Sequence, residues 1–195
     1  APTRLMDKAG YGKGYKYAEE HPEKFHGVGR FDIETGELHD SGDCFSAKMG
    51  ESLSRLADND GRIIGITAAM SSGTGMDVFS AAHPDRFFDV GIAEGHAVSM
   101  AGGMAKQGMV PVFAVYSSFL QRGYDMLIHD VALQNLHVVF CVDRAGLVGS
   151  DGETHQGIFD LSFLSSIPNM HIMAPKNKWE LSDMIKYAVD FPTPI

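Results

Sequence analysis

The chain has 195 residues, of which 44% are hydrophobic and 21% charged, and its formal net charge is −9 at pH 7. This composition is ordinary for a soluble globular protein, and the length allows one good-sized domain with a short extension. The acidic charge argues against a nucleic-acid partner, and no apolar run approaches the ~20 residues of a membrane-spanning helix. Cys44 and Cys141 match neither a disulfide framework nor a zinc site, so we expect a reducing compartment and no metal ligands.

Residues 1–43 differ from the rest of the chain, because they are rich in Gly, Lys, Glu and Tyr and show no sustained hydrophobic period. Within them, Gly10–Tyr15 is typical of a mobile loop. We predict that residues 1–43 form an interdomain linker or arm, and that residues 44–195 form the folded domain.

From Cys44 onward, short apolar runs alternate with segments of helical period. The expected helices are Phe45–Leu56 with Asp43 as N-cap, Gly75–Ala82 ending before Pro84, Ala93–Gln107 ending at Gly108, Phe119–Asn135, and a last helix opened by a capping box of Asn177 and Glu180. The expected strands are Ile63–Thr67, Phe87–Val90, Val110–Val115, Val138–Val142 and His171–Ala174. This alternation predicts an α/β fold: a doubly wound, mainly parallel sheet with helices on both faces, whose ligands gather beyond the carboxyl ends of the strands.

The first unusual segment is Asp89–Ala97, where a strand ends, a glycine allows a tight turn, and a helix begins with Glu94 in its first turn. A helix-start acid stabilised by the helix dipole is the simpler interpretation of Glu94, and a functional carboxylate is the alternative. The helix that follows is dense in Gly, Ala and Ser. Because Gly in a helix costs about 1 kcal/mol against Ala, we expect close packing there, either on its own sheet or across a subunit interface.

Two further segments place charged and aromatic residues in loops. Asp143–Gly157 is long and has no apolar period; in it, Arg144 could bind an anion, and Asp151 and His155 could form an acid–base or orienting pair. A solvated loop tip is the alternative interpretation. Val115–Arg122 surrounds a helix start with two aromatic residues and an arginine, and by itself this pattern is also typical of a core segment.

These segments carry a resemblance to one family. Asp89–Ala97, Tyr116–Arg122 and Asp143–Gly157, in this order, resemble segments of deoxyxylulose-phosphate synthases. Gly12–Tyr15 and Phe25–Gly27 resemble that family's link between its first two domains. The resemblance therefore covers nearly the whole chain.

The resemblance implies a three-domain thiamine-diphosphate enzyme that condenses pyruvate with D-glyceraldehyde 3-phosphate, releases carbon dioxide and forms 1-deoxy-D-xylulose 5-phosphate, a precursor of isoprenoids and thiamine. This chain would be its pyrimidine-binding middle domain. The diphosphate and Mg²⁺ would bind in the preceding domain, because no Gly-Asp-Gly…Asn signature is present and Ser150–Gly152 with Asn177 is only an accidental likeness to it. We therefore expect negligible activity from the chain alone, a homodimeric enzyme, and a bacterial cytoplasmic location rather than a plastid one.

The resemblance also implies roles for individual residues. Glu94 would hydrogen-bond atom N1′ of the cofactor's aminopyrimidine, and Phe119 would stack on that ring. One departure lies beside this Glu, since the family usually has Gln where this chain has Gly95. The remaining predicted site residues are Arg144 for the substrate phosphate with Tyr116 close by, Asp151 and His155 to orient substrate, Arg122 near the same pocket, and Lys13 and His26 in the linker.

Two other interpretations stay open at this point. Transketolases and the β subunits of 2-oxoacid dehydrogenases share the sheet and the catalytic Glu, although Tyr116–Arg122 and Lys13 favour the synthase. A non-catalytic domain that binds a ligand or serves in assembly is also compatible with a doubly wound sheet.

Overall fold

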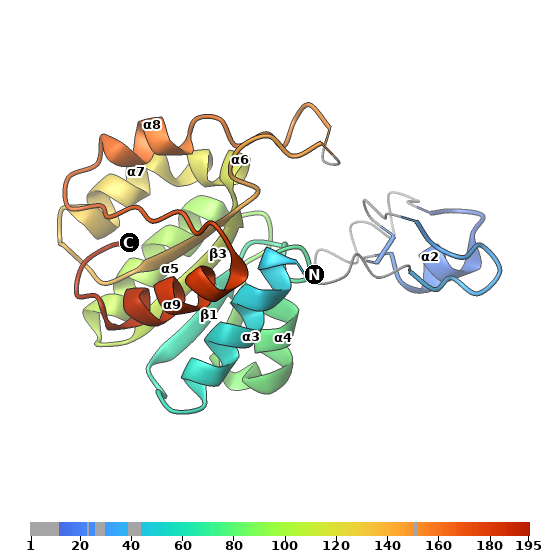
Figure 1. The fold of residues 1–195 in the computed structure, drawn as a ribbon, viewed down its shortest axis with the longest axis horizontal. Coiled ribbons are helices and arrows are strands. Elements are labelled where there is room, and N and C mark those ends of the chain that lie inside the picture. Colours follow the sequence, from blue (N-terminus) through green and yellow to red (C-terminus); the bar gives the residue numbers. More distant parts are fainter. Residues whose placement is uncertain (1–11, 23, 26–29, 39–43, 150–151) are drawn as a thin grey trace. The chain divides into compact units, whose positions relative to one another are not determined.

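The structure is a computed structural model that describes residues 12–22, 24–25, 30–38, 44–149 and 152–195. The chain divides into two compact units, Ala1–Cys44 and Phe45–Ile195. The second unit is built on a parallel sheet with strand order β2-β1-β3-β4, made of β1 (Ile63–Thr67), β2 (Phe87–Asp89), β3 (Val110–Tyr116) and β4 (Val139–Asp143) (Figure 1). Its helices are α3 (Phe45–Ala57), α4 (Met76–Ala82), η1 (Pro84–Arg86), α5 (Glu94–Lys106), α6 (Ser117–Leu120), η2 (Gln121–Gly123), α7 (Tyr124–Met126), η3 (Leu127–Ala132), α8 (Asp160–Ser165) and α9 (Lys178–Asp190). None of the helices in these described ranges is long and apolar enough to cross a membrane.

Helices cover both faces of this sheet, as the sequence predicts for a doubly wound fold. All of β1 is buried, because a parallel strand packed on both faces needs apolar side chains on both. On one face lies the first cluster, in which Ile64 and Ile66 pack with α5, η3 and α8; its buried members include Val98, Leu127 and Leu164. On the other face lies the second cluster, in which Ile63 packs with α3, α4 and α9; its buried members include Leu53, Phe79 and Ile185.

Two helix ends confirm the predicted signals, the stop at Gly108 and the cap at Asn177, whereas Asp43, the predicted N-cap of the first helix, lies outside the described residues. Gly108 has φ +85°, and the Met109 and Gly108 amides donate to the carbonyls of Met104 and Ala105 at 3.2 and 3.0 Å. This Schellman-type pattern satisfies the last carbonyls of α5. At the start of α9, Asn177 Oδ1 accepts from the Glu180 amide at 2.9 Å, as expected for an N-cap.

The predicted fifth strand, His171–Ala174, is wrong, since residues 171–174 form no strand. The outer edge of β4 is taken by the C-terminal residue: Ile195 donates to the Val138 carbonyl at 3.1 Å, and the Phe140 amide donates to the Ile195 carbonyl at 2.7 Å. The backbone amide of His171 instead donates to the Pro194 carbonyl at 3.1 Å. The edge hydrogen bonds that a fifth strand needs are therefore used by another segment.

The helix predicted over Phe119–Asn135 is broken into α6, η2, α7 and η3. Gly123 lies at the break and packs against α5, where an added Cβ would be 3.0 Å from Val98. Further along, the Leu133 amide donates to the Ile128 carbonyl at 2.9 Å, the five-residue spacing of a π-helix. A glycine that weakens the helix and close contact with α5 explain why the hydrophobic period alone did not give one straight helix.

The first unit contains a short helix, α2 (Lys16–Glu20), and a small aromatic cluster that the sequence analysis did not predict. The rings of Tyr15, Phe25 and Phe31 lie with their centres 5.2–5.6 Å apart. The Tyr15 hydroxyl donates to the Ile33 carbonyl at 3.0 Å, and burial raises the pKa of Tyr15. Of the predicted mobile loop Gly10–Tyr15, the structure describes residues 12–15, of which 12–14 form a turn before α2.

Candidate active site

The turn that precedes Glu94 is held by a carboxylate at the end of β2. Asp89 Oδ1 accepts hydrogen bonds from the backbone amides of Ala69 and Gly91, at 2.8 and 2.9 Å. Gly91 has φ +71°, which a glycine adopts without the strain that a side chain would add. Asp89 thereby joins the loop after β1 to the turn before α5, and this fixes the point at which Glu94 begins the helix.

Glu94 is a buried carboxylate with a cationic partner. Its side chain is 3% exposed, and Arg122 Nη1 donates to Glu94 Oε1 at 2.5 Å. The guanidinium carbon of Arg122 also lies 4.7 Å from the centre of the Phe119 ring. A planar, N–H-bearing cation thus contacts both the carboxylate and the aromatic face that the sequence singled out.

Phe119 belongs to an aromatic group formed by two separate segments. Its ring centre lies 5.8 Å from that of Tyr116, nearly parallel to it at 27°, and 5.1 Å from that of His155, which meets it edge-on. The Arg144 guanidinium lies 4.0 Å from the centre of the Tyr116 ring, within cation–π distance. The structure therefore brings together residues from the loops after β2, β3 and β4, as expected at the carboxyl edge of a parallel sheet.

Arg144 is held in an unusual backbone conformation. Its φ is +56°, a left-handed value that costs energy for a residue with a Cβ and is concentrated at functional sites. The neighbouring Asp143 supports it: Asp143 Oδ1 accepts from the Arg144 amide at 2.7 Å, and Oδ2 accepts from the Ser46 hydroxyl at 2.6 Å. Arg144 Nη1 donates to the Gly73 carbonyl at 2.9 Å. Backbone and guanidinium are therefore both fixed in place.

The loop that carries His155 is tied at its base. Gly146 and Gly157 exchange two backbone hydrogen bonds of 2.7 and 2.9 Å. The Gln156 side chain bonds both the amide and the carbonyl of Val148, at 2.7 and 2.9 Å. His155 Nδ1 lies 2.8 Å from the Thr154 hydroxyl, a contact that holds the ring from within its own loop.

Three predicted site residues are not placed at this site. Asp151 and His26 lie outside the described residues. Lys13 belongs to the first unit, which the structure describes separately from the second. Within the described ranges, no group of three or more His, Cys, Asp or Glu side chains could hold a metal ion.

Four residues that support the site were missed by the sequence analysis: Asp89, Asp143, Ser117 and Asp160. Ser117 and Asp160 are both buried, and the Ser117 hydroxyl donates to Asp160 Oδ1 at 2.6 Å. Only Asp89 and Asp143 gave any signal, because an Asp at the end of a strand before a Gly-containing turn often bonds backbone amides. The pair of Ser117 and Asp160 is separated by 43 residues, and no local pattern predicts such a contact.

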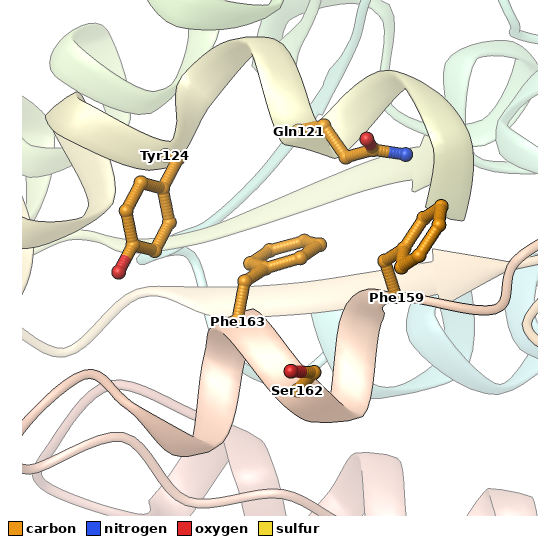
Figure 2. A pocket seen from close by; sticks show the side chains of 5 residues that line it. All are labelled: Gln121, Tyr124, Phe159, Ser162 and Phe163. Atoms are coloured by element: carbon orange, nitrogen blue, oxygen red, sulfur yellow. The ribbon is translucent and has the colours of Figure 1, made fainter.

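A hollow near these residues is lined by aromatic and neutral polar side chains. It measures about 330 Å³ and lies between the α6–α7 segment and α8, where its lining residues are Gln121, Tyr124, Phe159, Ser162 and Phe163 (Figure 2). Tyr124 and Phe163 meet edge-on with ring centres 5.8 Å apart. The lining contains no carboxylate, imidazole, amine or guanidinium, so the acid–base and anion-binding groups lie outside this hollow.

Curated relatives match this chain over its whole length. It is 56% identical over 195 residues to 1-deoxy-D-xylulose-5-phosphate synthase of Clostridium acetobutylicum, covering 100% of this chain and 32% of that protein. It is also 56% identical over 186 residues to the synthase of the same name from Halothermothrix orenii, covering 94% of this chain and 29% of that protein. The chain thus spans about a third of the length of these curated relatives.

Solved structures show the same fold. A split-gene transketolase, described as an inactive β4 tetramer, matches with a TM-score of 0.69 and 27% identity over 78% of this chain and 49% of that chain. A transketolase from Leishmania mexicana matches in fold with a TM-score of 0.67 and 19% identity over 77% of this chain and 24% of that chain. Residues 45–195 match the family described as "Transketolase, pyrimidine binding domain". The resemblance to deoxyxylulose-phosphate synthases is therefore confirmed, and the chain belongs to the transketolase pyrimidine-binding domain family.

Proposed function

We propose that this chain is the pyrimidine-binding part of a longer thiamine-diphosphate enzyme, which forms 1-deoxy-D-xylulose 5-phosphate from pyruvate and D-glyceraldehyde 3-phosphate with release of carbon dioxide. The relatives that are 56% identical carry the name of this synthase. The observation that carries the proposal is the buried Glu94 carboxylate, which pairs with a planar cation that also contacts an aromatic ring at the carboxyl edge of the sheet.

The residues present fit the aminopyrimidine of that cofactor. The Arg122 guanidinium, a flat group with N–H donors, contacts both the Glu94 carboxylate and the Phe119 face, which supports this assignment. An aminopyrimidine is also flat and offers N–H donors, so it has the chemistry to make the same two contacts. Thiamine diphosphate, when bound, supplies the electron sink for the decarboxylation.

The chain's own residues would then act as follows. Glu94 shares a proton at N1′ of the pyrimidine, and Phe119 stacks on the ring. Arg144, whose guanidinium is held by Tyr116 and by the Gly73 carbonyl, binds the substrate phosphate through charge-assisted hydrogen bonds. His155 and Asp151 orient the substrate, and Arg122 supports the cofactor site.

The other parts of the proposal concern the whole enzyme. The chain spans about a third of the length of its curated relatives, so we place the diphosphate and Mg²⁺ site in a different domain. We also propose that the whole enzyme is homodimeric, bacterial and cytoplasmic. The chain alone should have negligible activity. The solved split-gene transketolase supports this expectation, because its chain resembles this one and its β4 tetramer is described as inactive.

The test uses the complete polypeptide that contains these 195 residues. Wild type should form 1-deoxy-D-xylulose 5-phosphate from the two substrates with thiamine diphosphate and Mg²⁺. Glu94→Gln should lower kcat by about 100-fold or more, the range expected when a proton-transfer group is lost. Glu51→Gln, at an exposed position of α3, is the matched control and should leave kcat unchanged.

Each outcome has a distinct meaning. If wild type forms no product, the proposed reaction is wrong. If Glu94→Gln is as active as wild type, the assignment of Glu94 is wrong even though the reaction is right. The 195-residue chain assayed alone should give no detectable product, and turnover by it would contradict the proposed division of the site between domains.

A transketolase reaction is the second candidate, because the split-gene transketolase has 27% identity and the same fold. The same protein should be assayed with a ketose phosphate as donor in place of pyruvate. Transfer from the ketose phosphate without use of pyruvate would favour this candidate over the synthase.

A further inference from the structure

Asp160 is a buried carboxylate for which the proposed mechanism has no use. Asp160 is 6% exposed, and among the described residues the other buried acid is Glu94. A buried carboxylate is costly unless it is hydrogen-bonded, so its retention calls for a partner and a reason. The partner is Ser117, itself 1% exposed, whose hydroxyl donates to Asp160 Oδ1 at 2.6 Å.

The two residues are the first residues of two helices, and each lies close in the sequence to predicted site residues. Ser117 is the first residue of α6, directly after Tyr116 and two residues before Phe119. Asp160 is the first residue of α8, five residues after His155. Their hydrogen bond is therefore a link between the segment with the aromatic face and the loop with the imidazole.

Gly157 completes this link. A Cβ added to Gly157 would lie 2.5 Å from the Arg144 carbonyl oxygen and 2.7 Å from Ser117 Cβ, and would overlap the Ser117 hydroxyl. The backbone of the His155 loop thus passes directly between Ser117 and Arg144. Because Gly157 is also paired with Gly146, a shift of Ser117 or Asp160 moves the base of the whole loop.

We propose that Asp160, acting through Ser117, is a positioning residue that keeps His155 against the Phe119 ring and Gly157 against Arg144. This inference rests on the proposed function. Asp160 accepts its hydrogen bond from Ser117, so its effect on turnover is indirect. The link needs a hydrogen-bond acceptor at residue 160 more than it needs a charge, since the donor is a neutral hydroxyl.

The experiment compares four variants of the complete polypeptide. Asp160→Ala and Ser117→Ala each remove the link and should lower kcat at saturating cofactor and substrates about tenfold or more, as expected when reacting groups are misplaced. Asp160→Asn keeps an acceptor oxygen and should retain kcat within about threefold. The control, Ser52→Ala, removes the hydrogen bond of 2.9 Å between the Ser52 and Ser182 hydroxyls that joins α3 to α9, and should leave kcat unchanged.

A second readout does not depend on turnover. The Gly146 and Gly157 amides, which bond each other's carbonyls, should exchange hydrogen faster in Asp160→Ala and Ser117→Ala than in wild type, but not in Ser52→Ala. If Asp160→Ala does not fold, Ser117→Ala carries both readouts.

The outcomes separate this inference from the proposed function. Normal kcat in a folded Asp160→Ala or Ser117→Ala, or a loss in Asp160→Asn as large as in Asp160→Ala, overturns the positioning role. An equal loss of kcat in Ser52→Ala also overturns it, since the effect would then be general destabilisation. If wild type makes no product, the proposed function fails, and unchanged exchange at Gly146 and Gly157 would then overturn the link as well.

Discussion

The two faces of the sheet bury polar groups of different kinds. On the side of the second cluster, the buried polar side chains of α3 are Ser52 and Ser54, which are neutral hydroxyls. On the side of the first cluster, α5 and α8 begin with the buried carboxylates Glu94 and Asp160. Because a carboxylate is far more costly to bury than a hydroxyl, the two acids on the first face need hydrogen-bond partners, which Arg122 and Ser117 provide.

The largest effect on stability should come from the second cluster. Phe79 is fully buried between α4 and the sheet, so Phe79→Ala leaves a cavity and should lower the free energy of unfolding by about 3–5 kcal/mol. Denaturant unfolding of the chain measures this. Phe88→Ala, at a ring that is 39% exposed on β2, is the matched control and should cost much less. Equal losses at the two positions would contradict the assignment of the second cluster as the stabilising core.

A smaller effect on the free energy of unfolding should distinguish alanine substitutions at two neighbouring glycines of α5, Gly102 and Gly103. A Cβ at Gly102 would lie 2.7 Å from the Asp130 carbonyl oxygen of η3, whereas a Cβ at Gly103 would meet nothing within 4 Å. Gly102→Ala should therefore destabilise by about 1–3 kcal/mol. Gly103→Ala should stabilise by up to about 1 kcal/mol, because Ala is the better helix former.

Thermal and denaturant unfolding of both variants measure these shifts. If Gly102→Ala is as stable as Gly103→Ala, the close approach of α5 and η3 is wrong. This pair also tests the explanation of the small-residue helix: a loss at Gly102 in the isolated chain shows that contact within the chain requires the glycine.

The last prediction concerns the pH dependence of stability and a thiol beside the second cluster. Burial, with a further contribution from the charge of Asp143, raises the pKa of Cys141 from its ordinary 9.0 to about 12. Above pH 9 the unfolded chain loses this proton while the folded chain keeps it, so the free energy of unfolding should fall as pH rises from about 9 towards 12. Unfolding measured between pH 8 and about 10.5 tests this, with Cys141→Ala as the variant in which this component of the slope disappears. An unchanged slope in that variant would mean that the thiol is not the group responsible.

Much of the fold was predictable because its signals are local. The apolar runs of β1 and β3, the stop at Gly108 and the cap at Asn177 each depend on residues within a few positions of one another. The strand His171–Ala174 was wrong, and the helix predicted over Phe119–Asn135 is a helical run over residues 117–132 that includes a 3-10 turn and a π-helical turn, because contacts with distant elements decided both. Gly123 packs on α5, and Ile195 takes the edge of β4.

The sequence by itself determined the parallel α/β sheet and the family. It also gave the predicted site residues Glu94, Tyr116, Phe119, Arg122, Arg144 and His155. Only the tertiary structure decided that Arg122 pairs with Glu94, that Arg144 is fixed by Tyr116 and Gly73, and that Ser117 and Asp160 join two parts of the site. The physical reason is one of range. Period, caps and turns act between near neighbours in the chain, whereas these contacts join residues 28, 71 and 43 positions apart, which meet only after the parallel strands have aligned their carboxyl ends.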